Sequence, residues 1–357
     1  MGSLRKWLMK ILMFLVVAAA AILILDWLVG RVIQWRTSGE RVSQYWRMSI
    51  LAEPYVMTKL GSKQPRLEGI TFNINEQGFR HNGPVLSEKT RPRIFFIGGS
   101  VAMGVGASAD DTTYAGCIQR RFPDIEFVNA GCPSYIAKQQ RIHLALNLLP
   151  LKPDGIVILD GFNDMAIPVA YGDRPGYPYL WDTYSGLLSG NLFRTLWAHL
   201  RMKSNINRVI SRIRTCNYAN SPAFEKDVLP KVLDQYVRAT AMTYDLCRSR
   251  GIRVWHVLQP QLATKKSRTA VEEKYMYGPF TEAMAKHYPR LIEKAAASSA
   301  AEKIPFLDMS GAIADVEESI FVDFCHLNDQ GQQLMADVMG EFLEKNGLGE
   351  LNRPEQR

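Results

Sequence analysis

The sequence predicts an α/β fold, a three-layer α/β/α sandwich around a five-stranded, mostly parallel sheet, plus an N-terminal transmembrane helix. From Arg93 onward, short apolar runs alternate with amphipathic helical patterns, as in βαβ units. Such alternation is typical of doubly wound, flavodoxin-like sheets, whose ligands bind outside the carboxyl ends of the strands. The chain has 357 residues, of which 47% are hydrophobic, and a net charge of +8. This composition excludes a wholly disordered chain, a collagen-like chain and a small disulfide scaffold.

The first element is an uncharged apolar run over residues 11–25, which Trp27, Leu28 and Val29 extend to about the 20 residues that span a bilayer. Basic residues precede it, so we expect residues 1–10 in the cytoplasm, a transmembrane anchor over 11–30 and export of the rest. No A-x-A cleavage site follows the run, which favours an anchor over a cleaved signal peptide or a buried core helix. No N-x-[ST] sequon occurs, which is consistent with a single-pass protein of a bacterial inner membrane whose domain lies in the periplasm or outside.

The exported part divides into a stalk and lead-in over 31–90, one α/β domain over 91–346 and a tail over 347–357. The expected strands are Ile94–Ile97, Glu126–Asn129, Gly155–Leu159, Ile252–Leu258 and Phe306–Leu307. The expected helices lie around Thr113–Phe122, Lys138–Leu148, Val232–Arg250, Phe280–Ala301 and Asp329–Lys345. Residues 165–225, rich first in Gly, Pro and aromatic residues and then in Arg, interrupt the alternation, and we expect an insertion that forms a lid.

The first expected strand ends in Gly98-Gly99-Ser100, with further glycines close behind. Glycines let the chain turn sharply off a strand and leave a serine hydroxyl exposed at the edge of the sheet. The same turn is also compatible with phosphate binding or with a purely structural role, although it lacks the G-K-[ST] of a P-loop. Ser100 is therefore a candidate nucleophile.

Two further turns follow neighbouring strands. Asn129-Ala130-Gly131 ends the second strand, and Asp160-Gly161-Phe162-Asn163-Asp164 ends the third. A backbone N–H of Gly131 and the side-chain amide of Asn163, together with the Ser100 amide, would make an oxyanion hole. The alternative is that Asn163-Asp164 is only a turn or a helix cap.

A last motif, Asp323-Phe324-Cys325-His326, precedes the C-terminal helix. An Asp three residues before a His in a loop is able to orient the imidazole through Nδ1 while Nε2 acts as a base. Of the six histidines, His326 alone has such a partner after the last strand, whereas His256 lies in an apolar strand and is expected in the core.

This ordered set of motifs resembles the SGNH hydrolases, the GDSL-type esterase and lipase superfamily, over about residues 92–345. The resemblance implies Ser100 as nucleophile, His326 and Asp323 as its partners, the Ser100, Gly131 and Asn163 groups as oxyanion donors, and Gly99 and Asp164 in substrate binding. Gly161-Phe162-Asn163-Asp164 matches the family's G-x-N-D motif. Gly98-Gly99-Ser100 departs from the usual Gly-Asp-Ser. The residues of these motifs resemble those of bacterial membrane-anchored members of the family.

The resemblance implies a serine esterase without a metal or cofactor. Because a tethered, exported domain acts near the membrane, we expect it to remove acyl groups, with acetyl expected, from an envelope or exported saccharide. The alternatives are an O-acyltransferase acting on a polysaccharide, a lysophospholipase or lipase-like esterase, and an inactive glycan-binding domain. Expected partners are an acylated saccharide or lipid, the membrane and a membrane-bound acyl-transfer protein, but no nucleic acid. In addition, Cys132 and Cys325 lie in loops that we expect to meet, which raises the hypothesis of a disulfide between them.

Overall fold

The computed structural model describes residues 2–37, 40–81, 83–172, 174–179, 181–276 and 278–352. The chain forms two compact units. One contains residues 1–38 and 180–214, and the other contains residues 39–179 and 215–357. The expected insertion is therefore divided: its central part belongs to the same unit as the N-terminal helix, and its ends belong to the unit that contains the sheet.

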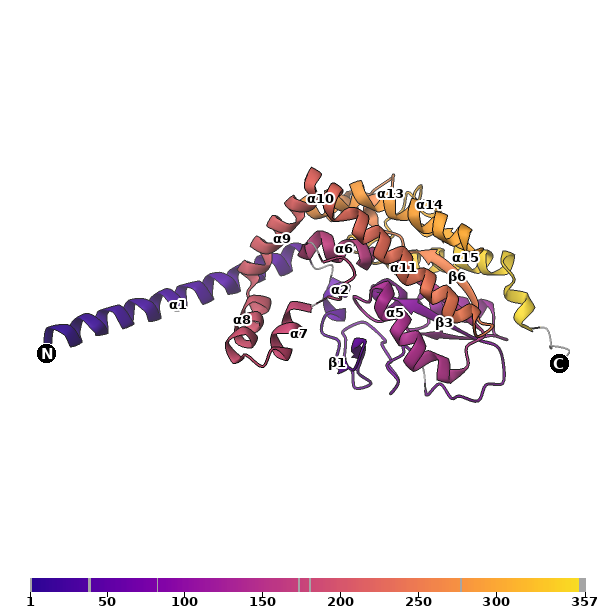
Figure 1. Cartoon of the computed structure of the whole chain (residues 1–357), viewed down its shortest axis with the longest axis horizontal. Coiled ribbons are helices and arrows are strands. Elements are labelled where there is room, and N and C mark those ends of the chain that lie inside the picture. The colour runs from indigo at the N-terminus through magenta and orange to yellow at the C-terminus, as the bar shows by residue number, and fades with distance from the viewer. Residues whose placement is uncertain are drawn as a thin grey trace. The chain divides into compact units, whose positions relative to one another are not determined.

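The first unit is helical. Helix α1 (Gly2–Thr37), indigo in Figure 1, contains the expected anchor, and its stretch Leu4–Val32 is long and apolar enough to cross a membrane. A helix of this kind serves as a membrane anchor or as a signal sequence. The insertion contributes α7 (Trp181–Leu188), α8 (Leu192–Lys203) and the first two thirds of α9 (Asn205–Ala219).

The second unit is built on a sheet. In the described residues five parallel strands lie in the order β4-β3-β5-β6-β7. Their bounds, each close to the predicted ones, are β3 (Arg93–Gly98), β4 (Glu126–Asn129), β5 (Gly155–Asp160), β6 (Arg253–Leu258) and β7 (Phe306–Asp308). The two central strands β3 and β5 are buried along their whole length, as expected for apolar strands covered on both faces. The predicted fold class is confirmed.

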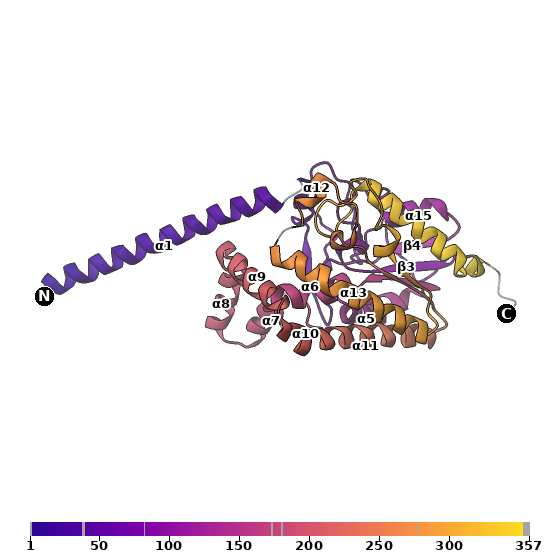
Figure 2. The ribbon, with the colours of Figure 1, turned by 90° about the horizontal axis from the view of Figure 1, so that it is seen from above.

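Helices cover both faces of the sheet (Figure 2). One face, with Phe96 and Val157, packs against α4 (Tyr114–Arg121) and α15 (Asp329–Lys345). The other face, with Ile156 and Ile158, packs against α5 (Ala137–His143), α11 (Leu229–Arg248) and α13 (Gly278–Ala301). The remaining elements are α3 (Ser100–Met103), the π-helix Leu144–Leu148, the 3₁₀ turn Leu149–Leu151, α6 (Phe162–Tyr171), α10 (Pro222–Asp227), the 3₁₀ turn Leu262–Thr264, α12 (Ala270–Glu273), α14 (Met309–Ala312) and the 3₁₀ turn Leu348–Asn352.

The segment that the sequence suggested as a polar, irregular stalk folds onto the sheet unit from residue 40 onward. It forms α2 (Glu40–Tyr45) and an antiparallel hairpin of β1 (Ile50–Glu53) and β2 (Met57–Leu60). Its apolar side chains form a third buried cluster with Met103, Val105, Cys132 and Tyr135. The scattered apolar residues of this segment have no regular period, so the sequence alone hides the fact that they share one packing surface.

Arg80 joins this segment to the turn that follows Ser100. Its side chain is 1% exposed, its Nε donates to Asp110 Oδ1 at 2.7 Å, and its Nη1 donates to the Gly104 carbonyl at 2.9 Å. The guanidinium also lies 5.0 Å from the centroid of the Phe72 ring. A buried cation with carboxylate, carbonyl and aromatic partners fixes the loops on both sides of it.

We expect Arg80→Met to lower the free energy of unfolding by about 3 kcal/mol, because it removes a buried cation, leaves the carbonyls of Met103 and Gly104 without its hydrogen bonds, and takes the ion-pair partner from the partly buried Asp110. Denaturant unfolding of the full chain in detergent micelles measures this. The matched control is Arg238→Met, which removes a 73% exposed arginine from a surface pair with Asp234 and should cost about 0.5 kcal/mol or less. Equal effects of the two substitutions would contradict the role of Arg80.

Candidate active site

Ser100 lies where β3 becomes the short helix α3. It is the first residue of that helix, so its backbone N–H has no acceptor within the helix and is directed outward. Gly104 ends the helix in a left-handed conformation, with φ 87°, and donates its N–H to the Ser100 carbonyl at 3.1 Å. The serine is thus held on a tight turn at the carboxyl end of a central strand, with its side chain only partly buried.

The loop after β7 brings His326 to this serine. His326 Nε2 lies 2.7 Å from Ser100 Oγ, and His326 Nδ1 lies 2.6 Å from Asp323 Oδ2. The second oxygen of Asp323 accepts the backbone N–H groups of Cys325 and His326, each at 2.8 Å. The three side chains therefore form a chain of hydrogen bonds in the order that nucleophilic catalysis by serine requires.

The ionisation of Asp323 suits this arrangement. Burial by itself raises the pKa of Asp323, but the charge and hydrogen bond of His326, together with the two backbone N–H donors, outweigh it, so that its pKa lies below the usual value. The carboxylate consequently stays ionised and accepts a hydrogen bond from the Nδ1–H group of His326. This leaves Nε2 free to take a proton from Ser100.

The expected oxyanion donors lie beside Ser100. The Asn163 amide, in the first turn of α6, packs directly over Gly99: a Cβ on residue 99 would overlap Asn163 Nδ2. The same Nδ2 donates one hydrogen to the Tyr135 carbonyl at 3.0 Å, which orients the amide and leaves its second hydrogen available. The N–H of Gly131 instead donates to Asn129 Oδ1 at 3.1 Å, so an oxyanion would have to compete with that side chain.

These contacts explain the glycine at position 99. Where the related motif has Asp, this chain has no room for a side chain, because the Asn163 amide occupies the space. Gly99 thus contributes through the room that it leaves for Asn163.

Asp164, which the sequence suggested for substrate binding, faces the interior instead. It is 7% exposed, and both carboxylate oxygens accept the Ala137 N–H, at 3.1 and 3.2 Å. Burial, reinforced by the charge of Asp160, raises the pKa of Asp164 well above its usual value. Asp164 therefore fixes the start of α5 and positions the turn before it.

The structure adds one residue that the sequence did not indicate. Trp46, directly after α2, lies with its ring centroid 5.7 Å from that of His326, in an edge-on arrangement with an interplanar angle of 70°. Its side chain is 56% exposed. No sequence signal distinguishes this tryptophan from others near the apolar helix α1, because only the folding of residues 40–74 onto the sheet unit brings it to the site.

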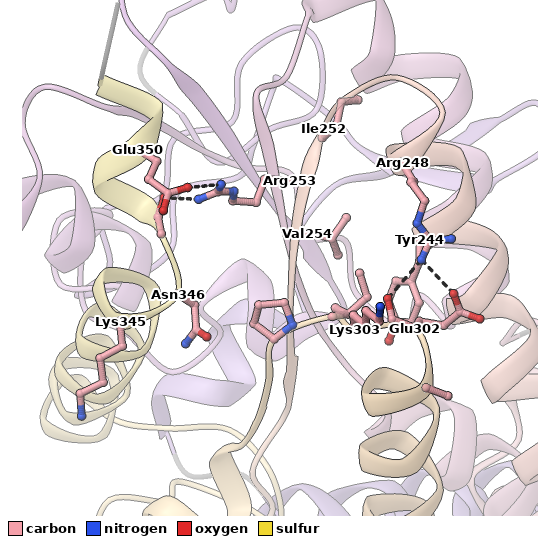
Figure 3. A pocket seen from close by; sticks show the side chains of 14 residues that line it. Tyr244, Arg248, Ile252, Arg253, Val254, Glu302, Lys303, Lys345, Asn346 and Glu350 are labelled. Atoms are coloured by element: carbon pink, nitrogen blue, oxygen red, sulfur yellow. Dashed lines mark hydrogen bonds and ion pairs between the residues drawn. The ribbon is translucent and has the colours of Figure 1, made fainter. Parts of the chain in front are cut away.

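Two cavities differ in their relation to these residues. One, of about 520 Å³, is lined by Arg41, Gln44, Tyr275 and by Val322 and Asn328, which flank the Asp323–His326 loop. The other, of about 820 Å³, surrounds Arg253 and Val254 at the amino end of β6 and is bordered by the Arg248–Glu302 ion pair (Figure 3). Because the strands are parallel and Ser100 follows a carboxyl end, the larger cavity at the amino end of β6 lies away from the catalytic residues, whereas Val322 and Asn328 place the smaller cavity beside the Asp323–His326 loop.

The disulfide hypothesis is wrong: all five cysteines are free and buried. Cys132 Sγ lies 4.0 Å from the Thr58 carbonyl, and burial raises its pKa to about 12. Cys325 Sγ lies 3.6 Å from His326 Nδ1, and burial raises its pKa well above the usual value, so it remains a thiol. Asp323, Cys325 and His326 have the spacing of a metal-binding group. Their side chains are, however, already committed to one another and to Ser100.

The comparison with family models identifies the family of this chain. The model of the GDSL-like lipase/acylhydrolase family matches residues 96–334, which contain Ser100, the Gly131 and Asn163 turns and the Asp323–His326 loop. The chain belongs to this family. It is an ester-hydrolysing enzyme of the GDSL type, and enzymes of this type are also called SGNH hydrolases. Among curated proteins none matches it by sequence.

Solved structures with a similar fold are distant in sequence. The acetyl xylan esterase AlAXEase has 14% identity and a TM-score of 0.44, with 70% of this chain and 98% of that chain covered. The lipase/acylhydrolase from Enterococcus faecalis has 14% identity and a TM-score of 0.43, with 74% and 100% covered. A two-domain esterase (CEX) active on acetylated mannans has 15% identity and a TM-score of 0.41, with 71% and 49% covered.

We expect Gly99→Ala to lower kcat for ester hydrolysis by about tenfold or more, because the new Cβ displaces the Asn163 amide, and one oxyanion donor is worth about 10²–10³ in kcat. A double-mutant cycle with Asn163→Ala measures the coupling. In the Asn163→Ala background, Gly99→Ala should have little further effect, since the overlap is gone. Independent, additive losses would contradict the proposed contact.

Proposed function

We propose that this family member is a serine esterase, exported and tethered to a bacterial inner membrane, which removes acetyl or similarly short acyl groups from a saccharide. The observation that carries the proposed chemistry is the hydrogen-bonded series Ser100 Oγ, His326 Nε2, His326 Nδ1 and Asp323, with distances of 2.7 and 2.6 Å. The apolar helix α1 and the basic residues before the apolar run support the proposed tether.

The proposed mechanism has two acyl-transfer steps. Ser100 Oγ attacks the ester carbonyl while His326 Nε2 takes its proton, and the imidazolium is stabilised by Asp323. The negative charge on the carbonyl oxygen is held by the Ser100 N–H and the Asn163 amide, with the Gly131 N–H as a third donor once it leaves Asn129. Collapse breaks the bond to the sugar oxygen, which takes the proton from His326 and leaves as a hydroxyl group. Water then attacks the acyl-serine while His326 takes its proton, and collapse of the second tetrahedral intermediate returns that proton to Ser100 Oγ and releases the carboxylic acid.

Two features beside the catalytic residues support a saccharide. Trp46 offers an exposed aromatic surface next to His326, and the apolar face of a sugar ring packs well against such a surface. The neighbouring cavity of about 520 Å³ has a size suited to a small ligand and presents the side chains of Arg41, Gln44, Glu68 and Tyr275. Charged and amide groups of this kind bind sugar hydroxyls, whereas a long acyl chain requires an apolar channel.

Labelling by a fluorophosphonate probe tests the nucleophile. We expect the full chain to be labelled, Ser100→Ala to lose both labelling and hydrolysis of p-nitrophenyl acetate, and the control Ser249→Ala, which removes an exposed hydroxyl, to retain both. A folded protein that the probe does not label would favour the inactive glycan-binding alternative.

Trp46→Ala tests the substrate class. We expect KM for an acetylated oligosaccharide to rise by about tenfold, equivalent to about 1.4 kcal/mol of binding, with kcat/KM for p-nitrophenyl acetate within about twofold of the parent enzyme. Trp46→Phe, which keeps an aromatic face, should restore most of the affinity. If Trp46→Ala reduced kcat equally for both substrates, its role would be to position His326. Higher kcat/KM for p-nitrophenyl palmitate than for the acetate would contradict the short-chain assignment.

A further inference from the structure

Helix α8 exposes a broad apolar face. The residues at positions 192, 193, 196, 197 and 200 repeat every three to four residues and so lie on one side of the helix. They are large, and each is more than half exposed: Leu192, Phe193, Leu196, Trp197 and Leu200. In α9, Ile210 and Ile213 are also more than half exposed. A patch of this size on a protein surface marks a site that something apolar covers.

The turn between α8 and α9 is fixed to the apolar N-terminal helix, which belongs to the same compact unit. Asp26 of α1 accepts hydrogen bonds from Ser204 Oγ at 2.7 Å, from the Ile206 N–H at 2.9 Å and from Asn205 Nδ2 at 3.2 Å. Gly30, one turn further, lets Asn205 approach, because a Cβ there would lie 2.5 Å from its Nδ2. The single acidic residue of the apolar stretch is thus satisfied by the α8–α9 turn.

These contacts set the depth of the turn. Asp26 is followed by Leu28 and Val32 before the apolar stretch ends, a rise of about 9 Å along the helix axis. If α1 spans the bilayer, the α8–α9 turn lies at about the level where acyl chains meet headgroups, and α8 extends from that level.

The positive charge of the α8–α9 segment favours an anionic membrane surface. Residues 191–214 contain six basic residues, Arg194, Arg201, Lys203, Arg208, Arg212 and Arg214, and no Asp or Glu. Basic residues near a bilayer surface are each attracted to anionic lipids by about 1 kcal/mol. An apolar helical face within a strongly basic segment is typical of helices that lie in the membrane interface. The same charge disfavours pairing with a second copy, because like charges would meet.

We propose that the α8–α9 hairpin is a second membrane-binding element, in which the apolar face of α8 inserts among the acyl chains and the basic segment meets anionic phospholipid headgroups. This inference rests on the proposed anchoring by α1. The hairpin would then form the membrane-bound unit together with α1, and the chain passes between this unit and the catalytic unit three times, near residues 38, 180 and 214. Three connections restrict how far the active site moves from the bilayer far more than a single flexible stalk would.

Site-directed fluorescence in liposomes tests the proposal. The native cysteines are buried, so single cysteines introduced at exposed positions take up a maleimide-linked NBD probe selectively. The full chain carrying Phe193→Cys or Leu196→Cys is reconstituted into vesicles of phosphatidylcholine and phosphatidylglycerol, with and without brominated acyl chains. The matched control is Leu86→Cys, an exposed leucine of the catalytic unit, 63% exposed.

We expect brominated lipid to quench the probes at 193 and 196 by about twofold or more and to leave the probe at 86 unchanged. Quenching at 193 and 196 as weak as at 86 would overturn the proposal. The proposal would also fail if the probes at 193 and 196 were shielded from water in a manner that depends on protein concentration and persists without brominated lipid, since a second copy of the chain would then cover α8. A probe at Leu15→Cys, within α1, distinguishes failure of the hairpin proposal from failure of the proposed anchor. If it is quenched and those in α8 are not, only the hairpin proposal fails, whereas absence of quenching at both sites removes the anchor as well.

Discussion

The hydrogen bond between Ser100 Oγ and His326 Nε2 joins residues 226 positions apart in the chain, and the sheet unit is organised around its two ends. Ser100 is fixed because β3 is a central strand, paired with β4 on one side and β5 on the other. His326 is fixed because the Phe321–Leu327 bridge closes its loop and Asp323 accepts both the imidazole and the backbone N–H groups beside it. The all-parallel order of strands places the turns that follow them on one edge, which is the geometric condition for the whole site.

A second aspartate and histidine show that such a pair does not define a site by itself. His256 Nε2 lies 3.2 Å from Asp160 Oδ1, but the hydroxyl groups of Tyr236 and Tyr244 complete its surroundings, and the ring is fully buried between β6 and the helices α11 and α13. This network satisfies a polar side chain in the core. His256 Nδ1 also lies 3.3 Å from Ser299 Oγ, but Ser299 is fully buried, whereas Ser100 at Nε2 of His326 is only partly buried. The structural and the catalytic histidine therefore differ in whether the hydroxyl group on the second ring nitrogen can be reached from solvent.

The segment between the apolar helix α1 and the first strand of the sheet connects that helix to the catalytic residues. Arg80 binds the turn after Ser100, Arg41 pairs with Asp329 at 2.8 Å at the start of α15, and Trp46 packs on His326. These contacts reach both ends of the Ser100–His326 hydrogen bond, so the residues that leave the N-terminal helix also form one wall of the site. A segment with this role is part of the enzyme, and its length and sequence are constrained by packing.

Local patterns of hydrophobicity, glycine and polar residues along the chain specify the alternation of strands and helices, the apolar N-terminal helix and the motifs that contain Ser100, Asn163, Asp323 and His326. Four features emerge only when the chain is folded: the burial of Asp164 against Ala137, the free thiols of Cys132 and Cys325, the room that Gly99 leaves for an amide, and the position of Trp46 beside His326. Each of these depends on how segments distant in the chain pack together. A local pattern specifies which face of an element is apolar, but the partner that covers that face is chosen by the three-dimensional arrangement of the whole unit.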